Sequence, residues 1–233
     1  MERMNEQIDI KELKAEQRAE VYSWMGEFRE PSVALRGKPF WSWNGDLDAA
    51  ELLRQIDILE EMGMGGAFMH SRTGLKTEYL ESEWFDLINA CAEKCDVKGL
   101  EGWLYDEDRW PSGTAGGIVT QEPKCRMRSI VLSQYASGDS IEWPCASEFI
   151  EAHLVDLEGL HLNSYLPIQQ NAFSECPEGQ QVLIFYREIH PSNSFYNGGA
   201  YLDTLNRSAT DAFIESTHEK YRQHCGHHFG KSI

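Results

Sequence analysis

The sequence lacks long apolar runs. No stretch approaches the roughly 20 residues that a membrane-spanning helix requires. The N-terminal segment MERMNEQIDIKELKAEQRAE is rich in charge and lacks the apolar centre of a secretory signal peptide. We therefore expect a soluble, cytoplasmic protein.

Basic residues are scarce as well. The chain has 21 Lys and Arg residues against 38 Asp and Glu residues, and its formal net charge is −17. Nucleic acids and anionic membranes are bound through clustered Lys and Arg side chains. The charge balance therefore argues against nucleic acid and membrane surfaces as partners, although an acidic surface alone indicates no particular ligand.

The cysteines follow no disulfide framework. The six of them stand far apart, at Cys91, Cys95, Cys125, Cys145, Cys176 and Cys225. A chain of this size has no need of a disulfide scaffold, so reduced thiols in the cytoplasm are the expected state.

Two groups of residues resemble metal ligands without completing a site. Cys91 and Cys95 share one face of a predicted helix, but no second pair follows, and packing in the core is favoured. The His-rich stretch at 224–228 suits the negative end of a helix dipole better than a metal. We predict no metal site and no cofactor within this chain.

The first half of the chain alternates between short apolar segments and helical periodicity. Residues 39–45, 65–70 and 100–108 read as strands, and residues 49–62 and 84–98 read as the helices between them. A strand–helix–strand–helix–strand order is typical of parallel strands joined by right-handed crossovers. The fold class predicted for this half is α/β.

The alternation ends near residue 120, where several β-rich segments follow one another. CRMRSIVLSQ, EFIEAHLVDLEG, LHLNSYLPI and QQVLIFYREIH indicate an antiparallel insertion, although the last of them is also compatible with a fourth parallel strand. A final helix is predicted over 208–225, with Ser208 and Asp211 spaced like a capping box.

We therefore divide the chain into four parts. Residues 1–35 form an N-terminal helix (about 8–28) and a connector, and residues 36–120 form the first βα units. Residues 121–190 form the β-rich insertion, and residues 191–233 form a further βα unit that is cut short.

Aromatic and polar residues gather where the predicted parallel strands end. Ligand sites of parallel α/β proteins lie at the carboxyl ends of the strands. Aromatic rings stack on the apolar faces of sugars, and carboxylates, Asn, His and Arg bind sugar hydroxyls. The predicted substrate-binding residues are Trp41, Trp43, Asn44, His70, Arg72, Tyr105, Asp106, Glu107, Asp108 and Trp110.

Several of these residues also have a purely structural interpretation. At least one of Trp41 and Trp43 is compatible with a place in the core, because the two alternate along a strand. His70 is compatible with a satisfied core histidine. The acidic triplet 106–108 is compatible with a charge cluster at a helix N-terminus.

Three motifs resemble a known group of proteins. PFWSWNG, GGAFMHSRTG and LYDEDRWPSGTAGG, in this order, resemble the N-terminal half of bacterial glycoside hydrolases related to the alpha-L-rhamnosidase-type enzymes. The resemblance covers about residues 25–233. It implies a partial (β/α)8 (TIM-type) barrel comprising the first three or four βα units, with the antiparallel β insertion.

The resemblance also carries expectations about chemistry. It implies that the ten residues named above line a sugar pocket, while the catalytic residues stay unknown. Related enzymes invert at the anomeric carbon with two carboxylates, and a calcium ion lies near the site of the full-length enzyme. The general acid is expected on a strand beyond Ile233, so the expected partners are an oligosaccharide and the missing C-terminal half of the barrel.

Three functional hypotheses follow. The first is a glycoside hydrolase acting on O-glycosidic bonds of oligosaccharides, present here as a fragment that is inactive alone. The second is a non-catalytic carbohydrate-binding module. The third is another hydrolase in which His70 and the acidic triplet bind a catalytic metal.

Overall fold

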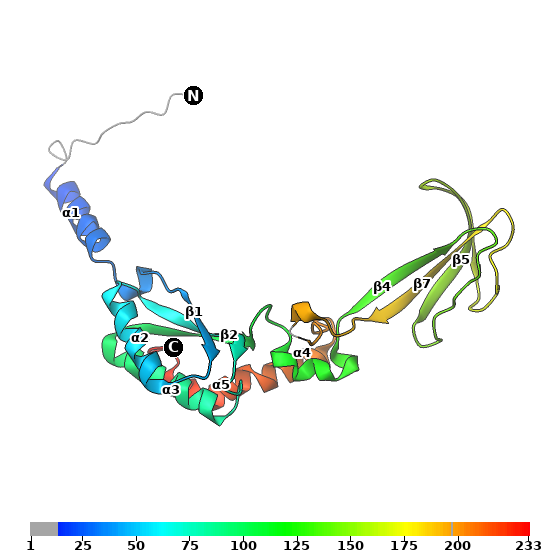
Figure 1. The fold of residues 1–233 in the computed structure, drawn as a ribbon. Helices are drawn as coiled ribbons and strands as arrows, with labels where there is room; N and C mark the ends of the chain where they lie inside the picture. The colour runs from blue at the N-terminus through cyan, green and yellow to red at the C-terminus, as the bar shows by residue number, and fades with distance from the viewer. Residues whose placement is uncertain (1–13, 197) are drawn as a thin grey trace. The chain divides into compact units, whose positions relative to one another are not determined.

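The computed structural model describes residues 14–196 and 198–233, which fall into two compact units (Figure 1). The first unit takes in the chain up to Arg109 and again Thr217–Ile233, and the second is Trp110–Ser216. Each unit has hydrophobic clusters of its own. No helix among the described residues is long and apolar enough to span a membrane.

The first unit is built on a parallel three-stranded sheet with the order β1-β2-β3. Its strands are β1 (Phe40–Gly45), β2 (Gly66–Leu75) and β3 (Glu101–Asp108). The crossover helices α2 (Ala49–Glu61) and α3 (Ser82–Lys98) connect them in the βαβαβ order that the sequence predicts.

Side chains from one face of this sheet and from its helices form a single core. The face carries Trp43 and Met69, both 1% exposed, and Trp84 and Ile88 of α3 pack against it. The helix α5 (His218–Cys225) returns from far along the chain and adds Tyr221 to the same core. The helices that pack on this face, α3 and α5, therefore come from two regions of the sequence more than 100 residues apart.

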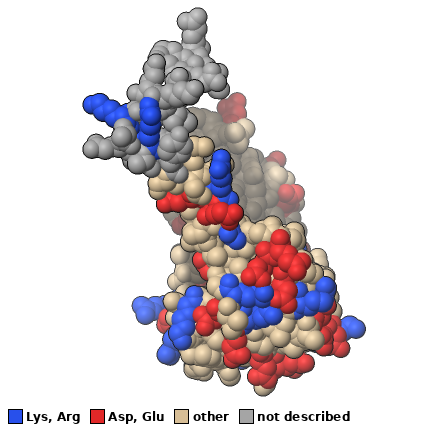
Figure 2. Space-filling view, turned by 90° about the vertical axis from the view of Figure 1, so that its left-hand side faces the viewer, with Lys and Arg blue, Asp and Glu red and all other residues tan. Residues whose placement is uncertain are grey.

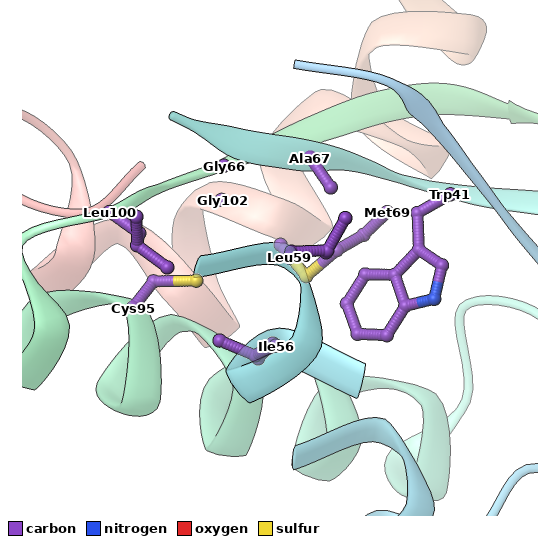
Figure 3. A pocket seen from close by; sticks show the side chains of 9 residues that line it. All are labelled: Trp41, Ile56, Leu59, Gly66, Ala67, Met69, Cys95, Leu100 and Gly102. Carbon is purple, nitrogen blue, oxygen red and sulfur yellow. The ribbon is translucent and has the colours of Figure 1, made fainter. Parts of the chain in front are cut away.

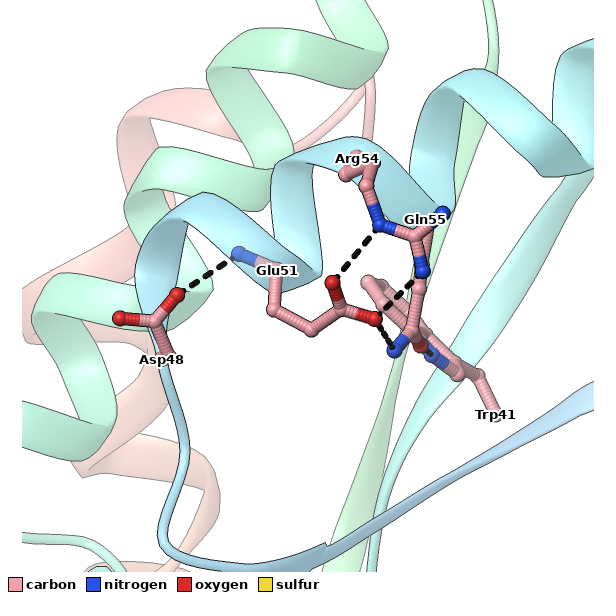
Figure 4. Close-up of polar contacts among 5 residues, drawn as sticks. All are labelled: Trp41, Asp48, Glu51, Arg54 and Gln55. Carbon is pink, nitrogen blue, oxygen red and sulfur yellow. Dashed lines mark hydrogen bonds and ion pairs between the residues drawn. The ribbon is translucent and has the colours of Figure 1, made fainter.

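A chain of polar contacts fixes the start of α2 against β1 (Figure 4). Asp48 Oδ1 caps the helix by accepting the Glu51 N–H at 2.8 Å. The Glu51 carboxylate accepts from Arg54 at 2.7 Å and from Gln55 at 2.8 Å, and these contacts lower its pKa to about 2. Gln55 Oε1 in turn accepts the Trp41 indole N–H at 2.6 Å, which holds that ring on the helix side of β1.

Close packing explains two glycines in the strands of this sheet. A Cβ at Gly66 would lie 1.7 Å from the Glu101 carbonyl oxygen, and one at Gly102 would lie 3.2 Å from Met69 Cε. Packing there leaves an apolar gap of about 10 Å³ (Figure 3). The gap is lined by Trp41, Ile56, Leu59, Gly66, Ala67, Met69, Cys95, Leu100 and Gly102.

The second unit contains an antiparallel four-stranded sheet with the order β4-β7-β5-β6. Its strands are β4 (Arg128–Tyr135), β5 (Phe149–Glu158), β6 (His161–Ile168) and β7 (Gln181–Ile189). One face is packed by a buried cluster that contains Val182 and Ile184, both 0% exposed. The helix α4 (Arg207–Ser216) packs with short 3-10 turns in a separate cluster of this unit.

The predicted partial (β/α)8 barrel is wrong. The described residues contain one parallel sheet of three strands and a separate antiparallel sheet of four. The segment considered for a fourth parallel strand is β7, which pairs antiparallel with both β4 and β5. Its buried positions Val182 and Ile184 alternate with less buried ones, the pattern of an antiparallel strand with one covered face.

The predicted final helix over 208–225 is two helices. α4 ends at Ser216 and α5 begins at His218, and Thr217 lies between them at a φ of −118° and a ψ of −74°. The predicted capping box is also replaced, because Asn206 Oδ1 accepts the Ser208 N–H at 3.1 Å. The two helices belong to different units.

The leading helix is α1 (Ala15–Arg29), and the predicted residues 8–13 lie outside the described part of the chain. Trp24 and Phe28 stack with ring centroids 5.7 Å apart and are 63% and 75% exposed. Acidic and basic side chains are interspersed over the face seen in Figure 2. Asp57 of α2 pairs with Lys94 and Lys98 of α3 at 3.0 and 2.8 Å.

Candidate functional site

Both tryptophans of β1 point to the helix side of the sheet. Trp43 is 1% exposed and meets Trp84 edge-on, with ring centroids 5.2 Å apart. Trp41 is partly buried and lies against Trp43 at 5.3 Å. These rings are therefore parts of the core, whereas Asn44 at the strand end is exposed.

His70 lies on the opposite face of the sheet, packed among aromatic rings. Its ring meets Phe40 at 5.2 Å and Tyr105 at 4.1 Å, and the residue is 1% exposed. Among the described residues, no side chain forms a hydrogen bond with either ring nitrogen. Burial and the nearby charge of Arg72 lower its pKa, and the Arg109 backbone and the Asp108 carboxylate oppose this shift. The neutral imidazole is thus favoured.

The three consecutive carboxylates of β3 point in different directions. Asp106 faces α5, with Oδ2 3.5 Å from His218 Nε2. Glu107 is 0% exposed, and its Oε1 accepts the Asp108 N–H at 2.9 Å. The Asp108 carboxylate accepts a hydrogen bond from the Ser71 hydroxyl. Strand alternation and a register shift between β2 and β3 separate the charges, which is how one strand end accommodates three acids.

A buried hydroxyl network lies beneath this strand end. Trp84 Nε1 donates to the Tyr221 hydroxyl at 3.1 Å, and that hydroxyl donates to the Tyr105 carbonyl oxygen at 3.3 Å. Burial raises the pKa of Tyr221, and burial, Tyr221 and Glu107 together raise that of Tyr79. Both phenols stay protonated at neutral pH, and the Tyr221 hydroxyl ties α5 to the end of β3.

A pocket of about 490 Å³ opens between β3 and α5. Its walls are largely apolar, and its lining residues are Leu104, Tyr105, Asp106, His218, Glu219, Tyr221, Arg222 and Phe229. Two side-chain pairs reach it. His218 Nε2 lies 3.5 Å from Asp106 Oδ2, and Glu219 Oε2 accepts a hydrogen bond from Arg222 Nε at 2.7 Å. Its volume and its mixture of apolar walls with a few polar groups are typical of small-molecule sites.

The structure brings only part of the predicted site together. Tyr105 and Asp106 line the pocket. The Tyr105 ring also contacts His70 on the face of the sheet that is opposite Trp43 and Met69. Arg72 is exposed at the end of β2. Trp110 lies in the second unit, where its ring meets Phe195 at 5.7 Å.

Sequence reasoning missed the residues that α5 contributes. His218, Glu219 and Arg222 are separated from β3 by the whole second unit, and no local motif marks them. Tyr221 alone carried a signal, since helical periodicity places it on an inward face. Asp106 and His218 are more than 100 residues apart in the chain, and the periodicity of a single sequence does not indicate a contact at that separation.

The metal-like groups serve packing. Cys91 and Cys95 are buried, and burial raises the pKa of Cys95 to about 11. His224 stacks on Phe85 with ring centroids 4.1 Å apart, and His228 is buried with a lowered pKa. No group of three or more His, Cys, Asp or Glu residues able to hold a metal occurs in the described part of the chain.

Comparisons with known proteins assign the chain to no family. The sequence matches no protein-family model and no curated protein. Among solved structures, the chain is similar to a rhamnosidase from Novosphingobium sp. PP1Y, with 14% identity and a TM-score of 0.41. The match covers 71% of this chain and 27% of that one, so the chain spans about a quarter of the rhamnosidase's length. The likeness is too distant to carry an argument about the site.

Proposed function

We propose that the pocket between β3 and α5 binds a sugar, and that the chain is a carbohydrate-binding relative of glycoside hydrolases. The observation that carries the proposal is the composition of the pocket. The Asp106 carboxylate lies beside the apolar wall of Leu104 and Phe229 and the Tyr221 ring. A sugar presents hydroxyls to such a carboxylate and an apolar ring face to such a wall. The motifs quoted above, which resemble those of rhamnosidase-type enzymes, agree with this choice of ligand.

The charges around the pocket favour recognition over hydrolysis. Glycoside hydrolysis uses two carboxyl groups on opposite sides of the scissile bond, about 5 to 9.5 Å apart. Asp106 can supply one of them, but Glu219 is held by Arg222 and Glu107 is buried. The pocket therefore favours a non-catalytic carbohydrate-binding module, and a glycoside hydrolase is the second candidate function.

Calorimetric titration tests the proposal. We expect L-rhamnose or another neutral monosaccharide of a panel to bind the 233-residue chain. Asp106→Asn should lower the association constant by about tenfold, since hydrogen bonds to a charged group contribute about 1.5–3 kcal/mol. The control Asp211→Asn removes an equal charge from α4 and should bind like the wild type.

Two results would contradict the proposal. One is the absence of binding heat for every sugar at millimolar concentration. The other is equal affinity of the wild type and Asp106→Asn. Release of nitrophenol from nitrophenyl alpha-L-rhamnoside in the same samples separates the two candidate functions, because only a hydrolase releases it.

A further inference from the structure

We infer that His218, oriented by Thr217, is a positioning residue that fixes the Asp106 carboxylate at the mouth of this pocket. The functional meaning of the inference rests on the proposed sugar site. Its geometry does not, because the three residues form one connected set in the first unit.

Thr217 uses its hydroxyl in an unusual way. It occupies the N-cap position of α5, where a threonine side chain ordinarily accepts a backbone N–H of the first turn. Here the side chain makes no capping hydrogen bond. Its Oγ1 lies 2.9 Å from His218 Nδ1, and the residue is 0% exposed. The hydroxyl therefore orients the imidazole ring instead of capping the helix.

This contact selects one tautomer of the ring. The far nitrogen, Nε2, faces Asp106 Oδ2 at 3.5 Å. A carboxylate accepts hydrogen bonds, so Nε2 must carry the proton for the contact to be favourable. In the neutral ring Nδ1 is then an acceptor, and the Thr217 hydroxyl donates to it. For the neutral ring, this is the arrangement of protons that satisfies both contacts.

Tyr105 and Arg222 line the pocket together with Asp106 and His218. On α5, Arg222 is occupied by Glu219 through contacts of 2.5 and 2.7 Å. On β3, Tyr105 carries a phenol whose pKa is raised by burial and by Asp106. On α5, His218 Nε2 faces Asp106 Oδ2 at 3.5 Å.

Nitrogen-15 NMR of the labelled full-length chain tests the tautomer without any ligand. The chain has eight histidines, and loss of one signal in His218→Gln assigns the ring. We expect the wild type to hold its proton on Nε2, and Thr217→Val to give a mixture of tautomers. Thr210→Val, a matched change in α4, should leave the signal unchanged. A proton on Nδ1, or no response to Thr217→Val, would overturn the inference.

Sugar affinity supplies the second readout. His218→Ala should weaken binding by about tenfold, because Asp106 loses its positioning partner. His218→Gln keeps an N–H donor within reach of the carboxylate and should restore most of the affinity. Equal affinities of the wild type and His218→Ala would sink the inference. If no sugar binds the wild type, the proposed function fails, and the tautomer spectra still decide the role of His218.

Discussion

At the scale of single residues, burial gives His70 a specific effect on stability. Its pKa is lowered from 6.5, chiefly because the ring is buried beside Phe40 and Tyr105. Just below pH 6.5 the unfolded chain therefore binds a proton that the folded chain does not. The free energy of unfolding therefore rises with pH through this window. The stabilisation that comes from the neutral His70 ring is fully present above the window and is lost as the pH falls.

His70→Phe should flatten this pH dependence. The substitution keeps an aromatic ring among aromatic neighbours and removes the titrating group. Urea unfolding at a series of pH values from about 7 down to about 5 measures the effect. We expect a smaller loss of unfolding free energy on acidification than in the wild type. His228, whose pKa is also lowered by burial, accounts for part of the remaining slope.

The control is His161→Gln, a change at an exposed position of β6. It should reproduce the wild-type pH dependence. A His70→Phe profile parallel to that of the wild type would show that the ring titrates as in the unfolded chain.

Residue types predicted part of the candidate site, and long-range contacts decided the rest. The acids of YDEDRW stand out in the sequence, and Asp106 does reach a pocket. Their separate directions depend on strand alternation combined with the register shift opposite Met69 and Ser71. One sequence cannot show that shift, nor the approach of His218.

At the scale of elements, Ile56 links α2 to the sheet. The residue is 1% exposed and borders the small apolar gap shown in Figure 3. Ile56→Ala should lower the free energy of unfolding by about 2–5 kcal/mol, because the new cavity merges with a region that is already imperfectly filled. Chemical denaturation measures the change.

Val97→Ala is the matched control for this experiment. Val97 is 85% exposed on α3, so its truncation removes almost no buried surface. We expect a change within about 0.5 kcal/mol. A similar destabilisation by both substitutions would contradict the assignment of Ile56 to the core.

Local sequence patterns predicted the helices correctly where the helix ends depend only on neighbouring residues. The spacing of Leu52 and Ile56 indicates α2, and Asp48 caps it. Gly99, at a φ of 65°, ends α3 where the sequence places a helix stop. The break at Thr217 was missed because Phe213 and Tyr221 keep helical spacing across it, although they pack in the cores of different units.

At the scale of the whole molecule, the alternation of strands and helices in the sequence correctly predicted parallel pairing. It does not determine whether the strands close into a barrel. A βαβαβ pattern determines how neighbouring strands connect, and β1, β2 and β3 follow it. Barrel closure depends on strands that pair at a distance, and after β3 the chain enters an antiparallel sheet. The resemblance in three motifs implied a barrel with more parallel strands. The described residues form only three of them, β1 to β3.

The most direct test of the central claim is to map sugar binding over the whole chain. Titration of the nitrogen-15-labelled protein with L-rhamnose, followed by amide NMR spectra, reports on both units at once. The account predicts shifts concentrated at residues 104–106 and 218–222, which line the pocket, and none in the antiparallel sheet. Shifts that cluster on β4–β7, or no shifts at saturating sugar, would contradict it.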